Sequence, residues 1–322
     1  MELSIVVPCY NEAQNVRAFY DCLMGEIQGV AHAVEVIFVN DGSQDGTSQE
    51  LSRLYEEHQG CVKVIEFSRN FGKEAALIAG LMESKGEYVS IIDADLQQNP
   101  KYLSQMITYL DEHPDYDAVA AYQSKRKESK VLSFYKSCFY RLINRITDID
   151  IVYAASDFRT LRRCVVDAII DLPERCRFSK GIFAWVGFPT YYMPYEVEDR
   201  AAGTTKWNFL KLMSYAVDGI VAFSSTPLMM SSIMGFLFCA IAFLVMILTI
   251  IKTIFWGEPV AGYPTIVTTV LFVGGTQLFS LGILGQYMAK TYVETKQRPI
   301  YIIKNKMGSE DGIEEQRGVT HE

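Results

Sequence analysis

The sequence lacks a basic excess. Its 322 residues carry 30 Lys and Arg against 38 Asp and Glu, which gives a formal net charge of -8 at pH 7. Proteins that bind nucleic acid present a basic surface, so this charge balance argues against such a partner. The seven cysteines are scattered without a close pair. Neither a zinc site nor a disulfide framework is therefore indicated, and a reducing compartment is the default.

Charged residues are also missing from two long apolar runs, 228–251 and 264–289. Each run exceeds the ~20 apolar residues needed to cross a bilayer core, so the sequence predicts two transmembrane helices. The segment between them, 255–263, has no Lys or Arg, whereas both outer flanks are basic. The positive-inside rule then predicts a multi-pass protein of the cell inner (cytoplasmic) membrane with the N-terminal domain and both termini cytoplasmic. The alternative, two buried core helices, requires a larger soluble domain than this chain has.

Strand and helix patterns alternate through the first half of the chain. Short β-branched or aromatic runs occupy 34–39, 62–67, 88–93 and 117–122, and helical patterns such as 48–58 and 74–85 lie between them. This alternation predicts an α/β domain with a mostly parallel sheet and helices on both faces.

Two carboxylates one residue apart, Asp93 and Asp95, follow the apolar strand at 88–92. In an open α/β sheet, ligands lie beyond the carboxyl ends of the strands. Mg²⁺ prefers oxygen ligands and often bridges one or two carboxylates to substrate phosphates. The pair therefore indicates a metal clamp on a diphosphate, although Asp-x-Asp also occurs in turns and at helix N-termini.

Other strand ends carry polar residues too, at 8–12, 40–43 and 68–73. Each segment alone fits a turn or a helix cap. Together with Asp93 and Asp95 they predict one continuous ligand surface. Asp41 and Glu12 are suited to accept hydrogen bonds from a nucleoside, and Lys73 or Arg69 to neutralise a diphosphate.

The motifs VVPCYNE, VNDGSQDGT, FSRNFGKEAAL and DADLQQNP resemble the donor half of family 2 glycosyltransferases with the Rossmann-like GT-A fold. More closely, the chain is similar to the polyprenyl-phosphate glycosyltransferases, the group of bactoprenol glucosyltransferase and dolichyl-phosphate mannose synthase. The likeness extends to about residue 303. It implies a nucleoside site at Pro8, Tyr10, Glu12 and Asp41, Mg²⁺ or Mn²⁺ on Asp93 and Asp95, Gln97 near the sugar or metal, and Asp157 beside the donor sugar. From the residues alone, Asp157 could equally cap the following strand or pair with Arg159 or Arg162.

Two basic segments are candidates for the acceptor phosphate. In the resembling family a loop near 123–136 carries two arginines; Arg126, followed by Ser129, matches the second, whereas Gln123 stands where the first is expected. A solvated loop is the alternative. A second family loop corresponds to Arg200, Gly203, Thr205, Lys206 and Trp207. A basic, glycine-hinged loop just before a membrane is suited to bind a phosphate, although flanking charge alone would explain the lysine.

The predicted organisation has five parts. These are a cytoplasmic GT-A domain at 1–206, an interfacial amphipathic helix at 207–223, a two-helix transmembrane hairpin at 224–290, a cytoplasmic tail packing on the catalytic domain at 291–306, and a disordered tail at 307–322.

The resemblance implies inverting transfer of a hexose, with glucose favoured, from a nucleotide sugar to polyprenyl (undecaprenyl) phosphate for cell-envelope glycosylation. UDP-N-acetylglucosamine and GDP-mannose remain alternative donors, and homo-oligomer formation stays open. One alternative function is a processive polysaccharide synthase, which usually carries a Gln-x-x-Arg-Trp motif that is missing here. The other is a non-enzymatic membrane nucleotide-sugar sensor.

Overall fold

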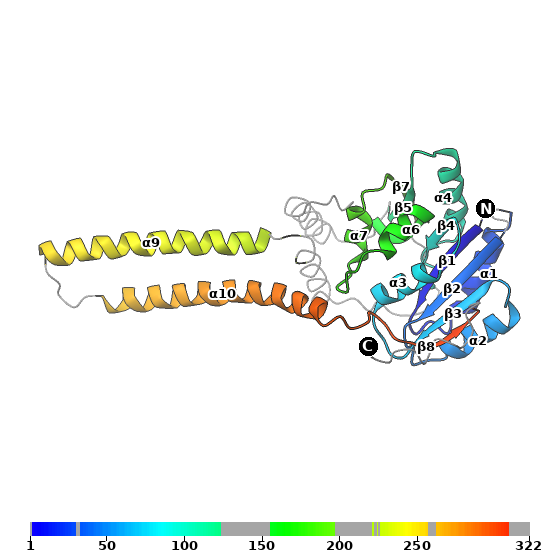
Figure 1. The fold of residues 1–322 in the computed structure, drawn as a ribbon, viewed down its shortest axis with the longest axis horizontal. Helices are drawn as coiled ribbons and strands as arrows, with labels where there is room; N and C mark the ends of the chain where they lie inside the picture. Colours follow the sequence, from blue (N-terminus) through cyan, green and yellow to red (C-terminus); the bar gives the residue numbers. More distant parts are fainter. Residues whose placement is uncertain are drawn as a thin grey trace, which may run out of the picture. The chain divides into compact units, whose positions relative to one another are not determined.

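The computed structural model describes residues 2–29, 33–123, 155–196, 221, 224, 226–256 and 262–308. The chain divides into two compact units (Figure 1). The first holds residues 1–142, 149–208 and 299–322, and the second holds 143–148 and 209–298. The predicted acceptor residues Arg126, Ser129, Arg200, Thr205 and Lys206 lie outside the described residues, as does nearly all of the predicted interfacial helix.

The first unit is built on an eight-stranded sheet in the order β7-β5-β6-β4-β1-β2-β3-β8. Strand β1 pairs in parallel with β2 and β4, and β2 pairs in parallel with β3. Strand β6 is antiparallel to both β4 and β5, and β8 is antiparallel to β3. The strands are β1 (Glu2–Cys9), β2 (Ala33–Asn40), β3 (Val62–Phe67), β4 (Tyr88–Ile91), β5 (Ala118–Gln123), β6 (Ala155–Arg162), β7 (Thr190–Tyr195) and β8 (Ile303–Met307). The predicted mostly parallel α/β fold is confirmed, with β6 and β8 as its reversed strands.

Helices cover both faces of this sheet. They are α1 (Val16–Glu26), α2 (Thr47–Glu57), α3 (Lys73–Glu83), α4 (Lys101–Glu112), α6 (Arg163–Ile170) and α7 (Ser179–Trp185). On one face, Leu3 and Ile5 of β1 share a core with Phe19 of α1 and Met106 of α4. On the other face, alanines of α3 pack against β2 and β3. This two-sided burial explains why the strands read as continuous apolar runs.

Helix α3 crosses β1 so closely that one position requires glycine. A Cβ added to Gly80 would lie 2.2 Å from Val6 Cγ1. Small side chains such as Ala75 and Ala79 line the same helix and are buried. The close approach fixes α3 on the sheet, and with it the residue that begins the helix, Lys73.

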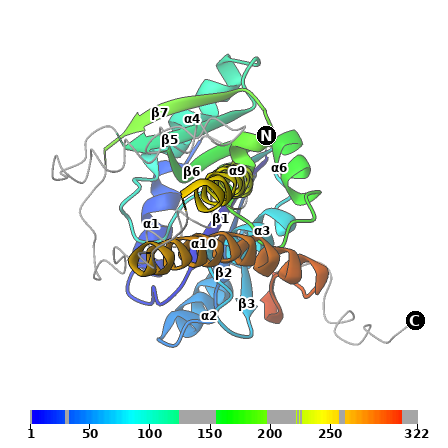
Figure 2. The same ribbon diagram turned by 90° about the vertical axis from the view of Figure 1, so that its left-hand side faces the viewer.

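The second unit contains the helices α9 (Thr226–Trp256) and α10 (Tyr263–Thr295). They lie side by side in both views (Figures 1 and 2), and the rings of Phe238 and Phe272 meet edge to face at 5.2 Å. These helices cover the two uncharged runs of the sequence. Within the described residues, no helix is long and apolar enough to cross a membrane. The two membrane spans therefore stay a prediction.

Candidate active site

The loops that follow the parallel strands are tied to one another by hydrogen bonds. After β1, the backbone N–H of Asn11 donates to Ser43 Oγ at 2.9 Å, and its side-chain Oδ1 accepts from Gln44 N at 2.9 Å. The N–H of Glu12 donates to Thr47 Oγ1, also at 2.9 Å. The loops after β1 and β2 thus form one surface at the carboxyl ends of the strands, as the sequence predicts.

Asp41 connects this surface to the loop after β3. It is buried, and its two carboxylate oxygens accept the backbone N–H groups of Phe71 at 2.6 Å and Gly72 at 3.0 Å. Burial raises the pKa of the Asp41 carboxyl group, against the opposing effect of these two donors. The neighbouring Gly42 has φ +63, and a Cβ there would lie 2.3 Å from the carbonyl carbon of Arg69. The end of β2 therefore serves as a close-fitting support for residues 69–72.

Lys73, the first residue of α3, contacts two acids, Asp93 just after β4 and Asp157 in β6. Its Nζ lies 2.7 Å from Asp93 Oδ1 and 3.1 Å from Asp157 Oδ2. Burial opposes the charge on Lys73, but the two carboxylates outweigh it and raise the pKa of the ammonium group. Burial likewise opposes ionisation of Asp157, yet the nearby cations, Lys73 first, hold its pKa far below the ordinary value. Lys73 and Asp157 are therefore both charged at neutral pH.

The reversed direction of β6 explains why Asp157 lies here. Arg159 of β6 is paired with Ile91 of β4, and the two strands run in opposite directions. Asp157 lies two residues before Arg159, and Asp93 lies two residues after Ile91. Because β4 and β6 are antiparallel, the two acids reach the same edge of the sheet. A β6 parallel to β4 would put Asp157 near the opposite edge.

A glutamine holds Asp93 from its other side. Gln98, which is buried, donates from Nε2 to Asp93 Oδ2 at 3.1 Å and to Ser156 Oγ at 3.4 Å. Its Oε1 accepts the backbone N–H of Asp93 at 3.0 Å. The sequence analysis selected Gln97 from the same run and missed Gln98. The two consecutive glutamines offered no pattern that separates their roles.

Asp95 and Gln97 lie on the exposed side of the same loop. Asp95 Oδ1 accepts the backbone N–H of Gln97 at 3.1 Å, and Leu96 between them has φ +59. Both side chains are partly exposed. Within the described part of the chain no three His, Cys, Asp or Glu residues gather as a metal cage. A nucleotide-bound Mg²⁺ or Mn²⁺ needs only one or two carboxylates besides phosphate and water, so the oxygen donors of this loop fit such a metal.

The remaining predicted nucleoside residues surround the first loop. Pro8 lies within β1, opposite Val39 of β2. Tyr10 is partly exposed directly after the strand. The carboxylate of Glu12 accepts Asn15 Nδ2 at 2.6 Å, which orients it at the start of α1. The structure brings these residues to the same strand ends as Asp41; their contact with a nucleoside stays a prediction.

Two further charged residues, Glu74 and Arg159, fix helix α7 beside Asp157. Glu74 was not predicted from the sequence, and Arg159 was considered there only as a partner of Asp157. Glu74, next to Lys73, accepts the backbone N–H of Ser179 at 2.8 Å and its hydroxyl group as well, and burial raises the pKa of Glu74. Arg159 is buried with its guanidinium 3.6 Å from the ring centroid of Phe183, and burial lowers the pKa of Arg159 to about 10. Such contacts join distant elements and leave no local sequence pattern.

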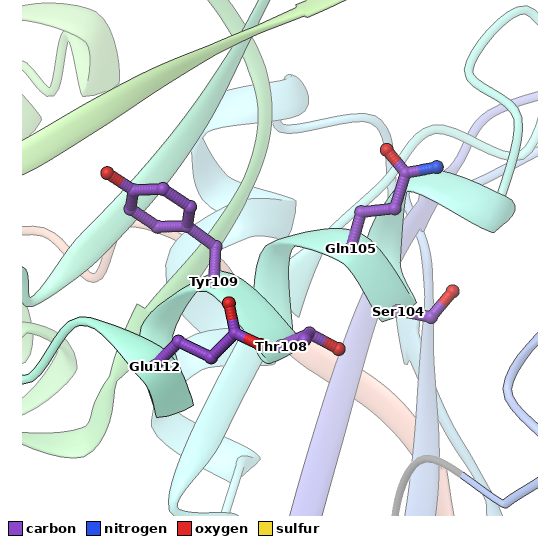
Figure 3. Close-up of a pocket in the computed structure, with 5 residues that line it drawn as sticks. All are labelled: Ser104, Gln105, Thr108, Tyr109 and Glu112. Carbon is purple, nitrogen blue, oxygen red and sulfur yellow. The ribbon is translucent and has the colours of Figure 1, made fainter.

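A separate hollow of about 320 Å³ lies on the outer side of α4 (Figure 3). None of the predicted site residues lines it. Its lining residues are Ser104, Gln105, Thr108, Tyr109 and Glu112. Both faces of the Tyr109 ring are already stacked, on His113 at 4.1 Å and on Tyr191 at 3.9 Å. The predicted site residues of the described part of the chain thus gather at the strand ends and not at this hollow.

Known proteins resemble this chain over much of its length. Residues 4–170 match the model of Glycosyl transferase family 2. A putative glycosyltransferase, CsbB, of Bacillus subtilis is 41% identical over 302 residues, covering 94% of this chain and 91% of that protein. The bactoprenol glucosyl transferase of Shigella phage SfV is 39% identical over 306 residues, covering 95% and 99%. Among solved structures, glucosyl-3-phosphoglycerate synthase of Mycobacterium tuberculosis aligns with a TM-score of 0.49 and 17% identity, covering 68% of this chain and 77% of that one.

The chain belongs to glycosyl transferase family 2, as the sequence motifs predict. The matched segment begins within β1 and includes β2 to β6, together with Asp41, Lys73, Asp93, Asp95 and Asp157.

Proposed function

We propose that this protein transfers a hexose, most directly glucose, from a nucleotide diphosphate sugar to polyprenyl phosphate with inversion at the anomeric carbon. The observation that carries the proposal is the meeting of Lys73, Asp93 and Asp157 at the strand ends, next to the partly exposed Asp95. The printed name of a relative that is 39% identical over almost its full length, bactoprenol glucosyl transferase, supports the lipid acceptor.

Asp95 and Asp93 hold Mg²⁺ or Mn²⁺ with the diphosphate in this proposal, and Gln97 lies next to them. When bound, the metal neutralises charge on the departing nucleoside diphosphate. Asp93 is already shared between Lys73 and Gln98, so its carboxylate is oriented before any ligand arrives. Such preorganised charge is effective because little rearrangement is needed during the reaction.

Asp157 remains ionised because its pKa is far below neutral. It is therefore suited to accept hydrogen bonds from hydroxyl groups of the donor sugar and unsuited to donate a proton at neutral pH. An acceptor phosphate is already ionised near pH 7, so its attack on the anomeric carbon requires no strong general base. The protein must instead bring two anions together and hold them in line.

The acceptor phosphate is assigned to basic and hydroxyl residues predicted from the sequence. These are Arg126 with Ser129 in one loop, and Arg200 with Thr205 and Lys206 in another. Arginine forms paired hydrogen bonds with phosphate oxygens, and lysine adds a point charge. These residues would offset the repulsion between the acceptor phosphate and the diphosphate of the donor.

The lipid acceptor requires a membrane, and α9 and α10 are the proposed anchor. The uncharged runs at 228–251 and 264–289, flanked by basic segments, support two spans in a cytoplasmic membrane. Large apolar side chains are exposed on these helices, including Phe236 at 78% and Leu278 at 72%. An apolar surface of this kind is suited to lipid.

The test is a transfer assay with radiolabelled UDP-glucose and undecaprenyl phosphate in detergent or in lipid nanodiscs. Label in the organic-extractable lipid supports the proposal. Label in polymer would identify a polysaccharide synthase instead, and nucleotide binding without any transfer would identify a sensor. Parallel assays with UDP-N-acetylglucosamine and GDP-mannose identify the donor.

A further inference from the structure

The C-terminal strand β8 belongs to the same sheet, although the chain runs from Phe67 to Ile303 between its neighbour β3 and β8. It pairs antiparallel with β3, with Ile65 opposite Lys306 (Figure 1). Just before β8, the carbonyl oxygen of Ile302 accepts the backbone N–H of Ser68 at 3.0 Å. Lys306 Nζ also lies 2.8 Å from Glu83 Oε2 at the end of α3. The segment from residue 301 onward therefore contacts the end of β3, where the Arg69–Lys73 loop begins.

A chain of aromatic rings leads from this segment into that loop. Tyr301 stacks on Phe67, with 4.9 Å between ring centroids and an interplanar angle of 12°. Phe67 is 1% exposed and meets the ring of Phe71 edge to face at 5.8 Å. The guanidinium of Arg69 lies 4.3 Å from the centroid of the Phe71 ring. Tyr301 thus supports Phe71 through a buried ring.

Phe71 is fixed from the opposite side by the site itself. Asp41 accepts the backbone N–H groups of Phe71 and Gly72, and the next residue is Lys73. Lys73 must reach both Asp93 and Asp157. The side chain of Phe71 is held by the aromatic chain and its backbone by Asp41. Loss of either support would let the start of α3 shift relative to the two acids.

We propose that Tyr301 is a positioning residue for the nucleotide-sugar donor, acting through Phe67 and Phe71 on the loop that places Arg69 and Lys73. This inference rests on the proposed function, because it assigns the donor diphosphate to the surface that Lys73 and Asp93 form. The C-terminal segment that contains Tyr301 and β8 then affects donor affinity in addition to closing the edge of the sheet.

The test compares Tyr301→Ala with Tyr301→Phe in the full-length protein. Tyr301→Ala removes the ring that stacks on Phe67, and we expect KM for the sugar nucleotide to rise about 3- to 10-fold, the range expected for loss of an aromatic pair. KM for the lipid acceptor should stay within about twofold. Tyr301→Phe keeps the ring and loses only the hydroxyl, which lies 3.4 Å from Met82 Sδ, so its donor KM should remain near that of the wild type.

Ile302→Ala is the matched control. Its side chain is 52% exposed, it lies in the same segment, and the substitution keeps the carbonyl that Ser68 contacts. We expect no change in either KM. Hydrogen exchange gives a second readout: in Tyr301→Ala the amides of Phe71 and Gly72 should exchange faster, because opening of the loop exposes them.

A donor KM within twofold of the wild type in Tyr301→Ala would overturn the inference. A similar rise in both the donor KM and the acceptor KM, together with a loss of thermal stability, would also overturn it, because that pattern indicates general unfolding. If Tyr301→Ala does not fold, Tyr301→Leu keeps an apolar side chain without the stacked ring, and the same outcomes decide.

Binding of UDP with Mn²⁺, measured by calorimetry without any acceptor, separates this inference from the proposed function. Wild-type protein that binds UDP but moves no label to lipid would contradict the proposed function, and the comparison of Tyr301 variants would still be decided by UDP affinity. Wild-type protein that glycosylates lipid, with Tyr301→Ala equal to it in UDP affinity, would contradict the inference alone.

Discussion

Lys73 Nζ lies 2.7 Å from Asp93 Oδ1, so an acid predicted to bind metal is also half of an ion pair. The same ammonium group reaches Asp157. Two carboxylates that converge on one ligand position repel each other unless a cation lies between them. Lys73 supplies that cation within the chain itself. A metal that binds Asp93 must share this carboxylate with Lys73.

Replacing Lys73 by methionine leaves Asp93 and Asp157 without their shared cation. We expect kcat/KM for sugar transfer to fall about 100-fold or more, the scale seen when one preorganised electrostatic partner is removed from an active site. Lys63→Met is the control, because Lys63 forms an ion pair with Glu35 at 2.7 Å outside the site. It should affect thermal stability alone. Retention of more than half of the wild-type kcat/KM by Lys73→Met would refute a catalytic role for the pair.

The pKa of Asp157 predicts how stability depends on pH. Because the pKa is depressed in the folded state, the stabilising contribution of Asp157 is fully present above its unfolded pKa of about 3.9. It is lost as the pH falls from there through the folded pKa. Thermal unfolding of wild type and Asp157→Asn should therefore differ most above about pH 5, and the difference should begin to shrink only below about pH 4, as the pH falls toward the folded pKa. A difference that grows toward acid pH would contradict the ion pair.

The contact of α3 with β1 predicts opposite effects for two glycine-to-alanine substitutions. Gly80→Ala places a Cβ 2.2 Å from Val6 Cγ1 and should lower the free energy of unfolding by about 1 to 3 kcal/mol, as overpacking does. Gly25→Ala in α1 meets nothing within 4 Å and should raise it by up to about 1 kcal/mol through helix propensity. Thermal or denaturant unfolding checks both. Equal effects of the two substitutions would show that α3 does not pack this closely.

Arg200→Ala tests the division between donor and acceptor sites. If Arg200 binds the acceptor phosphate, its loss should raise KM for undecaprenyl phosphate or lower kcat, with UDP affinity unchanged. A hydrogen bond to a charged group contributes roughly 1.5 to 3 kcal/mol, which corresponds to about 10- to 150-fold. A change confined to nucleotide affinity would contradict this assignment and indicate that Arg200 belongs to the donor site.

The sequence was sufficient for the parts of the site that depend on local pattern. Strand ends at Asp41 and Asp93 were predicted because apolar runs stop there, and parallel strands bring their carboxyl ends to one edge. The partners of these acids were not predictable in the same way. The Asp157–Lys73 pair requires β6 to run antiparallel to β4, and no local pattern states the direction of a strand.

The missed residues share a physical reason. Glu74 contacts Ser179 across 105 positions of sequence, and Gln98 reaches Ser156 across 58. Tyr301 stacks on Phe67 from the segment between α10 and β8. Periodicity describes which face of an element is buried, but it does not identify the element that covers it. Long-range contacts of this kind were therefore visible only in the fold.

The most direct test of the central claim is the metal dependence of sugar transfer to lipid in wild type and in Asp95→Asn, with Asp167→Asn as the control. Asp167 is 58% exposed in an i,i+4 pair with Arg163, away from the strand ends. We predict that wild type and Asp167→Asn transfer label from UDP-glucose to undecaprenyl phosphate with a saturable requirement for Mg²⁺ or Mn²⁺, and that Asp95→Asn folds but loses this transfer. Full transfer in excess EDTA, or an Asp95→Asn variant as active as the wild type, would contradict the account.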